Sequence, residues 1–505
     1  MTKYDVLIIG SGLGGLECAY ILAKEGYSVC VLEKNRQLGG NLQIFVRDKV
    51  IFDTGVHYIG GLDEGQNLHQ FFTYFELMDK LKLRRMDPDG FDRVTFDDDP
   101  KEYRHAMGYE RFYETLLKDF PHEKEGLRRY CQALQRICDD SPVYRVQSVV
   151  AEELSMQHMD IGAKPFIEDC VKDHTLRNVL AGTNPLYVGY PDRTPLYVHA
   201  LVTNTYIESS WKCVDGGAQI ARHLAKNIKA QGADIFRYSE VSRIIIGDKG
   251  VEGVETTDGR RIEAKYVISN IHPSQTLDLV EKERVRKAYR KRIKGLENSL
   301  SVFSLHLVFK PNTFEYLNHN YYHYKEKDVW SCTYYQEEKW PENYVIFVPA
   351  NSKSEVYADS MNVMAYMRFE EVMPWMDTHN TIPRRVSDRG KTYEEFKEEK
   401  AQLLFAELEK KFPGIRSKVK AYYTTSPLSY RDYIGTSDGS MYGIIKDYNQ
   451  PLRSFISPRT KVPNLYLTGQ NLNMHGMLGV TVSAFITCSR FCGLKYLIDK
   501  VKERN

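Results

Sequence analysis

Apolar and polar positions form clear blocks at the start of the chain, and these blocks predict a strand, a helix and a second strand. The apolar run at residues 6–9 is typical of a strand buried in a parallel sheet. It leads into a glycine-rich turn, a helical stretch to about residue 24, and a second apolar run at 28–32. This order predicts a βαβ unit, in which a helix joins two parallel strands.

Two later blocks carry the same kind of pattern. A helical stretch at 218–230 is followed by strand-like runs at 234–237, 241–246 and 253–257 and by another that ends near residue 270. Near the C-terminus, a strand-like run within 463–471 precedes a glycine-rich loop and a helix to about residue 497. We expect both blocks to complete the sheet that the N-terminal unit begins.

The intervening segments have a different character. Residues 66–205 show mostly helical periodicity, with helices expected at 68–81, 108–118 and 123–141. Strand-like runs lie at 301–308, 344–349, 361–367 and 419–423. The pattern therefore predicts an α/β protein with a discontinuous nucleotide-binding domain and an inserted α+β substrate domain. The first comprises residues 1–65, 211–295 and 455–505, and the second comprises 66–210 and 296–454.

Composition narrows the class of protein. The 505 residues are too many for one compact core, and the net charge of +2 provides no general basic field, so we expect no nucleic-acid partner. The nine cysteines show no CxxC and no metal-ligand spacing, which favours reduced thiols, a cytoplasmic location and no bound metal. The early core strand leaves no room for a signal peptide, and we expect no membrane-spanning helix.

The turn after the first strand carries a dinucleotide-binding pattern. Gly10 permits the tight turn, Gly12 and the following Leu13-Gly14 allow backbone to approach a pyrophosphate, and Gly15 allows close helix–strand packing. Glu33 ends the second strand, where it is placed to accept hydrogen bonds from a ribose. An acid at this position favours FAD or NAD over NADP.

The residues after this acid point to the flavin nucleotide. Lys34 follows Glu33 directly, and Gly39-Gly40-Asn41 lies where the chain would pass the pyrophosphate a second time. This arrangement resembles the extended FAD fingerprint of the flavin amine oxidase and phytoene desaturase group. The resemblance implies a Rossmann-type FAD-binding domain like those of glutathione reductase and the amine oxidases, with FAD as the cofactor.

Three further segments sharpen the resemblance. Residues 52–60, 426–443 and 463–479 are similar to the corresponding segments of retinol saturases and their bacterial relatives, and less closely to those of carotenoid isomerases and phytoene desaturases. The family implies an oxidoreductase that acts on carbon–carbon double bonds of an apolar polyene. Saturation, desaturation and redox-assisted isomerisation all remain open. Because the chain has no second dinucleotide fingerprint, we expect an external electron donor or acceptor.

The resemblance also implies site residues. Backbone and side chains near FAD are expected at Asp53, Gly55, Val241, Gly469, Gln470, Asn471, Gly476, Met477, Leu478 and Gly479. Asn471 stands where the family usually has an acid; an amide can both accept and donate, so FAD binding is expected to persist. His57 and His475 are the candidate catalytic residues, although each also fits an ordinary core histidine.

Two other functions stay open at this point. The chain could be an amine-oxidase-like enzyme for a small polar substrate, or a FAD-binding escort without turnover, like the Rab-escort and GDP-dissociation-inhibitor relatives of this fold. An apolar substrate also predicts peripheral contact with the inner face of a membrane. The aromatic stretch at 69–78 is the expected contact helix, unless it packs in the core.

Overall fold

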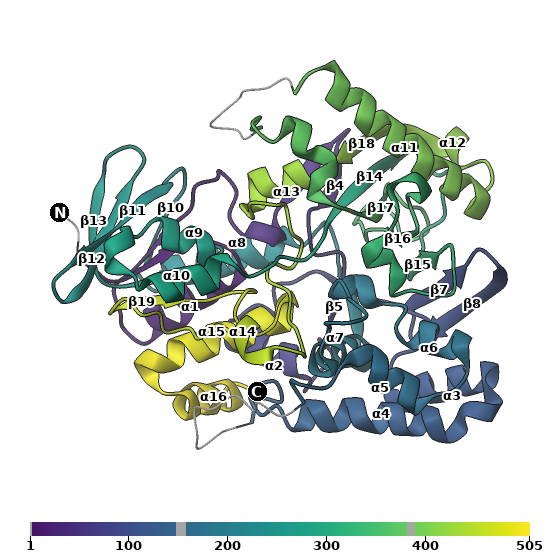
Figure 1. The fold of residues 1–505 in the computed structure, drawn as a ribbon, viewed down its shortest axis with the longest axis horizontal. Coiled ribbons are helices and arrows are strands. Elements are labelled where there is room, and N and C mark those ends of the chain that lie inside the picture. Colours follow the sequence, from purple (N-terminus) through teal and green to yellow (C-terminus); the bar gives the residue numbers. More distant parts are fainter. Residues whose placement is uncertain (1–2, 148–157, 381–388) are drawn as a thin grey trace.

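Two sheets at opposite ends organise the molecule (Figure 1). The computed structural model describes residues 3–147, 158–380 and 389–505. The strands of the first sheet come from three separated parts of the chain, within 3–32, 234–269 and 465–467, and those of the second lie within 92–105 and 301–425. These positions fall inside the two sets of segments expected above, while the domain boundaries themselves stay a prediction.

The first sheet grows from the N-terminal unit. Its order is β10 (Asp234–Phe236), β2 (Val29–Leu32), β1 (Lys3–Ile9), β13 (Arg261–Ser269), β12 (Gly250–Thr256) and β11 (Val241–Gly247), and β19 (Leu465–Leu467) also pairs with β13. The strands β10, β2, β1, β13 and β19 run parallel to one another. Their carboxyl ends therefore meet at one edge, where ligands bind in folds of this type.

Helices cover the first sheet as the apolar pattern predicts. The helix α1 (Leu13–Lys24) packs against α8 (Ala218–Ala230) and α15 (Gly476–Cys492). Nearly every residue of α1 is buried, because neighbouring helices enclose it as well as the sheet. The predicted C-terminal helix divides at Gly493, whose φ of +81° suits glycine, and α16 (Leu494–Glu503) continues at a bend of 118°. Among the described residues, no single helix has the length and apolar character needed to cross a membrane.

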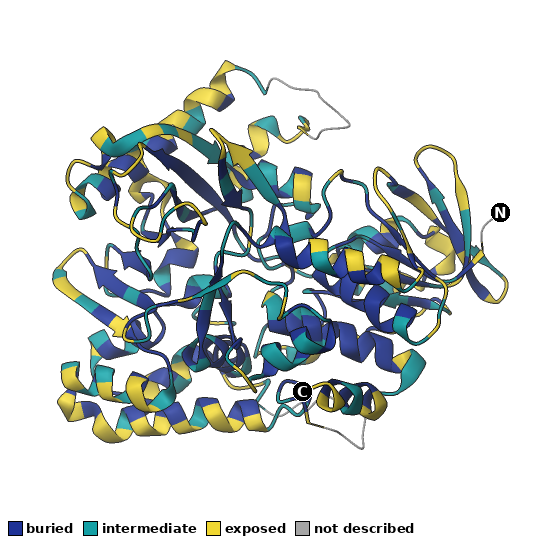
Figure 2. Cartoon of the chain, turned by 180° about the vertical axis from the view of Figure 1, so that it is seen from behind, coloured by how far each residue is buried: buried dark blue, intermediate teal, exposed yellow. Residues whose placement is uncertain are grey.

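The second sheet has the order β18 (Val419–Thr425), β14 (Ser301–Phe309), β17 (Ser360–Met367), β16 (Asn343–Phe347), β15 (Asn320–Tyr324), β7 (Asp92–Phe96) and β8 (Asp99–His105). Every residue of β14 is buried, and Figure 2 shows this sheet largely dark blue. The hairpin β7–β8 is a local exception within residues 66–205, which are otherwise mostly helical as expected. It forms because β7 pairs with β15, more than two hundred residues away, and local periodicity carries no trace of such a partner.

The segment expected to form a membrane-contact helix, residues 69–78, does not form an exposed helix. The structure has a short helix, α2 (Asn67–Tyr74), and Phe71, Phe72 and Phe75 are fully buried. The ring of Phe71 lies 4.8 Å from that of Phe485 in α15. These aromatic side chains pack in the core rather than facing solvent, so residues 69–78 are not an exposed apolar surface.

The remaining elements connect or cover the two sheets. The helices are α3 (Tyr109–Asp119), α4 (Lys124–Asp139), α5 (Ala163–Cys170), α6 (His174–Leu180), α7 (Leu196–Glu208), α9 (Pro273–Asp278), α10 (Lys287–Lys294), α11 (Lys391–Lys411), α12 (Ile415–Lys418), α13 (Pro427–Ile434) and α14 (Pro451–Ser454). The short strands are β3 (Ile44–Arg47), β4 (Val50–Asp53), β5 (Ile59–Gly60), β6 (Leu83–Arg85) and β9 (Ser210–Cys213).

Candidate active site

A cavity of about 540 Å³ lies between the carboxyl edge of the first sheet and one face of the second. At the first sheet it is lined by residues that directly follow β1, β2 and β13 and by Gly469, two residues after β19. Both candidate histidines and all the residues predicted to hold FAD line it, with the exceptions of Gly15 and Asp53. The fold therefore brings together segments that are far apart in the sequence.

The glycine loop has the geometry that its sequence predicts. Gly10 adopts a φ of +91°, which disfavours a side chain. A Cβ added to Gly15 would lie 2.2 Å from the Gly10 carbonyl oxygen, so close packing at this position requires glycine. Gly39 donates its N–H to the Ser11 carbonyl at 3.0 Å, and it pairs with Gly12 in a short parallel bridge. The glycine doublet thus lies directly beside the first loop.

Glu33 is tied to the glycine loop. Its carboxylate accepts the Ser11 N–H at 2.9 Å, the Ser11 hydroxyl at 2.6 Å and the Asn35 N–H at 2.9 Å. Since a carboxylate offers about four acceptor positions, one remains for a ribose hydroxyl. The acid therefore holds the loop in shape as well as facing the cavity.

Sequence reasoning missed Asn270, which lies beneath the same loop. With its oxygen turned toward the loop, its amide accepts the N–H groups of Gly12 and Gly15 at 3.3 Å. A Cβ on Gly12 would lie 2.8 Å from one terminal atom of the Asn270 amide, and one on Gly469 would lie 2.6 Å from the other. The sequence does place a polar residue directly after a predicted parallel strand. Such positions lie at the edge of the sheet where ligands bind, and this pattern could have identified Asn270.

The C-terminal segment closes the cavity from another side. The N-terminus of α15 faces it through Gly476 and Met477, so the positive end of the helix dipole points inward. Asn471 directs its side-chain oxygen to the N–H of Ile444 at 3.1 Å. Lys446 is buried, and no sequence pattern indicated a role for it. Its ammonium group donates to the carbonyls of Asn471, Leu472 and Ser454 at 3.0, 2.8 and 3.1 Å.

Gly15 and Asp53 lie off the cavity. Gly15 is beneath the loop, and Asp53 accepts the Gly217 N–H at 2.7 Å in a fully buried setting. Burial raises the pKa of Asp53 to about 7, with the Gly217 hydrogen bond acting in the opposite direction. Asp53 thus joins the end of β4 to the start of α8, and a direct FAD contact for it stays a prediction.

His475 is buried and His57 is half-buried, and both are uncharged at neutral pH. His57 stacks on Phe347 at 4.4 Å, and neither of its ring nitrogens has a hydrogen-bond partner. Burial, with His306 adding to it, lowers the pKa of His57 to about 3. His475 packs against Tyr442 at 4.5 Å, and burial followed by the charge of Lys446 lowers its pKa to about 3 as well. Neither is equipped to donate a proton as imidazolium near pH 7.

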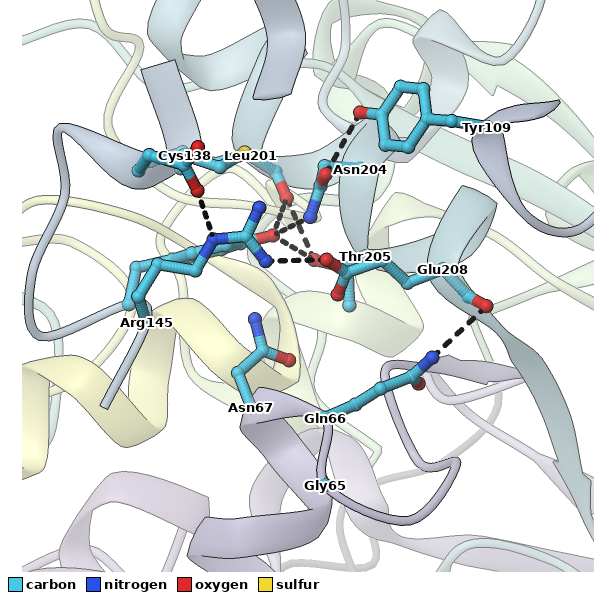
Figure 3. A network of polar contacts seen from close by, with 12 residues as sticks. Gly65, Gln66, Asn67, Tyr109, Cys138, Arg145, Leu201, Asn204, Thr205 and Glu208 are labelled. Atoms are coloured by element: carbon cyan, nitrogen blue, oxygen red, sulfur yellow. Dashed lines mark hydrogen bonds and ion pairs between the residues drawn. The ribbon is translucent and has the colours of Figure 1, made fainter. Parts of the chain in front are cut away.

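The second sheet supplies an apolar wall to the cavity. Tyr322 of β15, Phe347 of β16 and Tyr366 of β17 face it, together with Tyr206 of α7. At one end, Thr205 belongs to a hydrogen-bonded network (Figure 3). There Tyr109 donates to Asn204 at 2.9 Å, and Arg145 pairs with Glu208. Several polar groups at this end bond to one another, and the wall itself offers mainly aromatic surface.

These features together suit a dinucleotide with a redox-active ring. The glycine cradle and Glu33 fit the phosphates and ribose, and the inward end of α15 favours negative charge at the ring. The aromatic wall suits an apolar substrate beside that ring. Among the described residues, no cluster of His, Cys, Asp or Glu could hold a metal ion.

Comparison with known proteins agrees with this geometry. The sequence profile of the family described as flavin containing amine oxidoreductase matches residues 13–352. All-trans-retinol 13,14-reductase of Rattus norvegicus is 26% identical over 96% of this chain and 85% of its own length. Prolycopene isomerase 1, chloroplastic, of an Oncidium hybrid cultivar is 25% identical over 97% of this chain and 84% of its own. The solved structure of an oxidoreductase from Methanosarcina mazei shares the fold, with a TM-score of 0.63 and 17% identity over 96% of this chain and 99% of that one.

Proposed function

The chain belongs to the flavin-containing amine oxidoreductase family, and from this premise we propose that it acts on carbon–carbon double bonds of an apolar, retinoid- or carotenoid-like polyene. It is an oxidoreductase, and its cofactor is FAD. The observation that carries the substrate proposal is the continuous cavity, in which the nucleotide cradle around Gly12 and the aromatic wall around Phe347 share one space. The retinol reductase and prolycopene isomerase relatives support the same class of substrate.

The residues of the chain supply binding, orientation and exclusion of water. FAD, when bound, supplies two-electron redox chemistry. Glu33 and the glycine loop would hold the nucleotide, and the N-terminus of α15 would stabilise negative charge on its ring. His57, Phe347 and Tyr206 present flat surfaces that suit a conjugated chain. Saturation, desaturation and isomerisation all use this arrangement.

Purified holoenzyme separates the three functions considered from the sequence. Under anaerobic conditions, we expect a polyene from a retinoid and carotenoid panel to change the flavin absorbance of the oxidised or the reduced enzyme. Bleaching by small amines, with peroxide formed in air, would instead indicate an amine oxidase. Flavin that neither class of compound affects, but that dithionite reduces, would indicate an escort.

The electron partner and membrane contact belong to the same proposal. An external donor or acceptor is needed for net saturation or desaturation, because net saturation would leave FAD oxidised and net desaturation would leave it reduced, so a second redox partner must restore it after each turnover. A polyene partitions into lipid, so we expect transient peripheral contact with a membrane surface by residues other than 69–78. Flotation with anionic vesicles tests this, and protein that stays wholly in the soluble fraction would contradict it.

A further inference from the structure

A buried hydrogen-bonded chain leads away from the aromatic wall of the cavity. The hydroxyls of Tyr322 and Tyr58, both of which line the cavity, lie 2.7 Å apart. The Tyr58 hydroxyl donates to Oδ2 of Asp92 at 2.8 Å, and the Asn320 amide donates to Oδ1 of Asp92 at 2.8 Å. The cavity is thus connected to a carboxyl group that is 0% exposed and does not itself line it.

The sheet register fixes this chain in place. β15 runs parallel to β7 and aligns Asn320 with Asp92. Tyr322 lies two residues beyond Asn320 and therefore projects from the same face of the sheet. Tyr58 directly precedes β5 and reaches this face from the other side of the cavity. The three groups are held by packed strands, which is the rigidity that proton transfer requires.

The chain can carry a proton in either direction. With Asp92 ionised, each hydroxyl donates toward the carboxylate, and Tyr322 offers a lone pair to the cavity. With Asp92 protonated, the carboxyl group donates to Tyr58 and Tyr58 donates to Tyr322. The hydroxyl of Tyr322 then presents its O–H to the cavity. Between Tyr58 and Tyr322 the distance suits either donor.

The surroundings of Asp92 allow both its protonated and its ionised form near neutral pH. Burial raises its pKa to about 7, opposed by the Asn320 and Tyr58 hydrogen bonds and by the Lys212 charge. The ionisable groups that face it are Tyr58, Tyr322, Tyr206 and Lys212. Lys212 is itself buried, its ammonium group donates to the Leu317 and Val348 carbonyls, and burial lowers its pKa to about 7.

The tyrosines transmit the proton without storing charge. Burial raises the pKa of Tyr58 and of Tyr322 well above the ordinary value, so neither holds a lasting phenolate. When Tyr322 gives up its proton, Tyr58 must therefore replace it at once. Asp92 then replaces the proton that Tyr58 has lost. His57 and His475 cannot take this role as imidazolium donors, given their low pKa values.

We propose that Tyr322 exchanges a proton with the substrate and that Tyr58 and Asp92 are the positioning residues that supply and take up this proton. The inference rests on the proposed function. In saturation, the π bond of one carbon–carbon double bond breaks and two C–H bonds form. Tyr322 would provide the proton for one of these bonds, and reduced flavin, recharged by an external two-electron donor, would supply the other hydrogen with both electrons. Asp92 ends one proton poorer and recovers it from water after product release.

Single-turnover reaction of dithionite-reduced holoenzyme with all-trans-retinol in deuterated water tests the proposal. We expect two solvent deuterium atoms in the product, one from the flavin, whose transferable hydrogen is taken from solvent on reduction, and one from Tyr322. The rate for Tyr322→Phe should fall by at least about a hundredfold, without a change in FAD content or in the retinol concentration that half-saturates the rate. Asp92→Asn should remove the fall in rate as the pH rises through about 7. Tyr324→Phe is the matched control, because Tyr324 lies on the same strand, is equally buried and bonds to the Gly182 carbonyl outside the cavity. A Tyr322→Phe rate within threefold of this control would overturn the proposal.

A measurement without substrate separates the chain from the proposed function. Infrared spectra of the oxidised holoenzyme should lose one carboxyl band as the pH rises through about 7. This band should be absent in Asp92→Asn and shifted in Tyr58→Phe. If the band behaves in this way but no polyene reacts with the wild type, the proposed function fails while the proton store stands. If wild type and Asp92→Asn titrate alike, the proton chain is wrong whatever the substrate.

Discussion

The hydroxyl of Ser11 lies 2.6 Å from Oε2 of Glu33, which also accepts the Ser11 N–H at 2.9 Å. Glu33, the acid that the sequence pattern assigns to ribose binding, therefore also fixes the conformation of the glycine loop after β1. Ser11 in turn accepts the N–H of Gly39, so this bracing extends to the glycine doublet. Loss of Glu33 would affect both ribose binding and the shape of the loop.

Replacing Glu33 and Ser11 separates these two contributions. We expect Glu33→Ala to weaken FAD binding by roughly ten- to a hundredfold, since a hydrogen bond to a charged group contributes about 1.5–3 kcal/mol. Ser11→Ala should cost less, because the backbone N–H of residue 11 still bonds to the acid. Titration of apoprotein with FAD gives both affinities. Equal losses would show that Glu33 acts mainly as a brace, and an unchanged affinity in Glu33→Ala would exclude its ribose role.

Gly15 should be far less replaceable than Gly217. A Cβ at Gly15 would lie 2.2 Å from a backbone oxygen, whereas one at Gly217 would meet side-chain atoms at ordinary contact distances from 3.4 Å. We expect Gly15→Ala to lower the free energy of unfolding by about 3 kcal/mol and to reduce FAD content, and Gly217→Ala to change it by less than about 0.5 kcal/mol. Denaturant unfolding of both variants measures the difference. Similar midpoints would contradict the packing role of Gly15.

The pH dependence of turnover should not come from histidine. His57 and His475 both have a pKa lowered to about 3 by burial, so they stay neutral between pH 5 and 9. We expect His57→Phe to raise KM for a polyene by several-fold, because the stacking surface beside Phe347 changes, and to leave the shape of the pH–rate profile intact. Steady-state kinetics across this pH range checks both parts. Disappearance of an ionisation in the variant would show that His57 titrates during turnover.

Glu17 should make stability fall as the pH rises. It is fully buried in α1, accepts the Thr481 hydroxyl at 2.7 Å, and burial raises its pKa well above the ordinary value. Above the unfolded-state pKa of about 4.3, the native state binds more protons than the unfolded state, so stability declines by about 1.4 kcal/mol per pH unit until the native pKa is reached. Glu17→Gln should flatten this slope and raise Tm at pH 8. Thermal unfolding from pH 5 to 9 tests it, and identical slopes would mean that Glu17 is ionised in the native state.

The parts of the fold carried by continuous local pattern were predictable. The elements β1, α1, β2 and α8 lie within a few residues of the expected positions, because each combines an unbroken apolar period with a glycine turn. The glycine cradle followed for the same reason, since its residues sit within one βαβ unit.

What depends on distant partners was not predictable. Asp92 and Tyr322 acquire their relationship only when β7 pairs with β15, and no local pattern carries that register. The aromatic residues Phe71 and Phe72 fit a surface helix equally well until α15 and α16 cover them. Asp53 stands in a segment that resembles a flavin-binding sequence, yet its carboxylate turns to Gly217.

The lateness of β19 and α15 along the chain has a consequence for synthesis. The cavity needs Gly469 and the N-terminus of α15, which leave the ribosome after the other segments that line it. Tight capture of FAD can therefore occur only after the residues of α15 have been made and folded, and by mass action the captured cofactor then favours the native state over unfolded chains. The supply of flavin in the cell would therefore affect how much of the protein escapes degradation. Chains truncated before residue 465 should not bind FAD tightly and should be degraded.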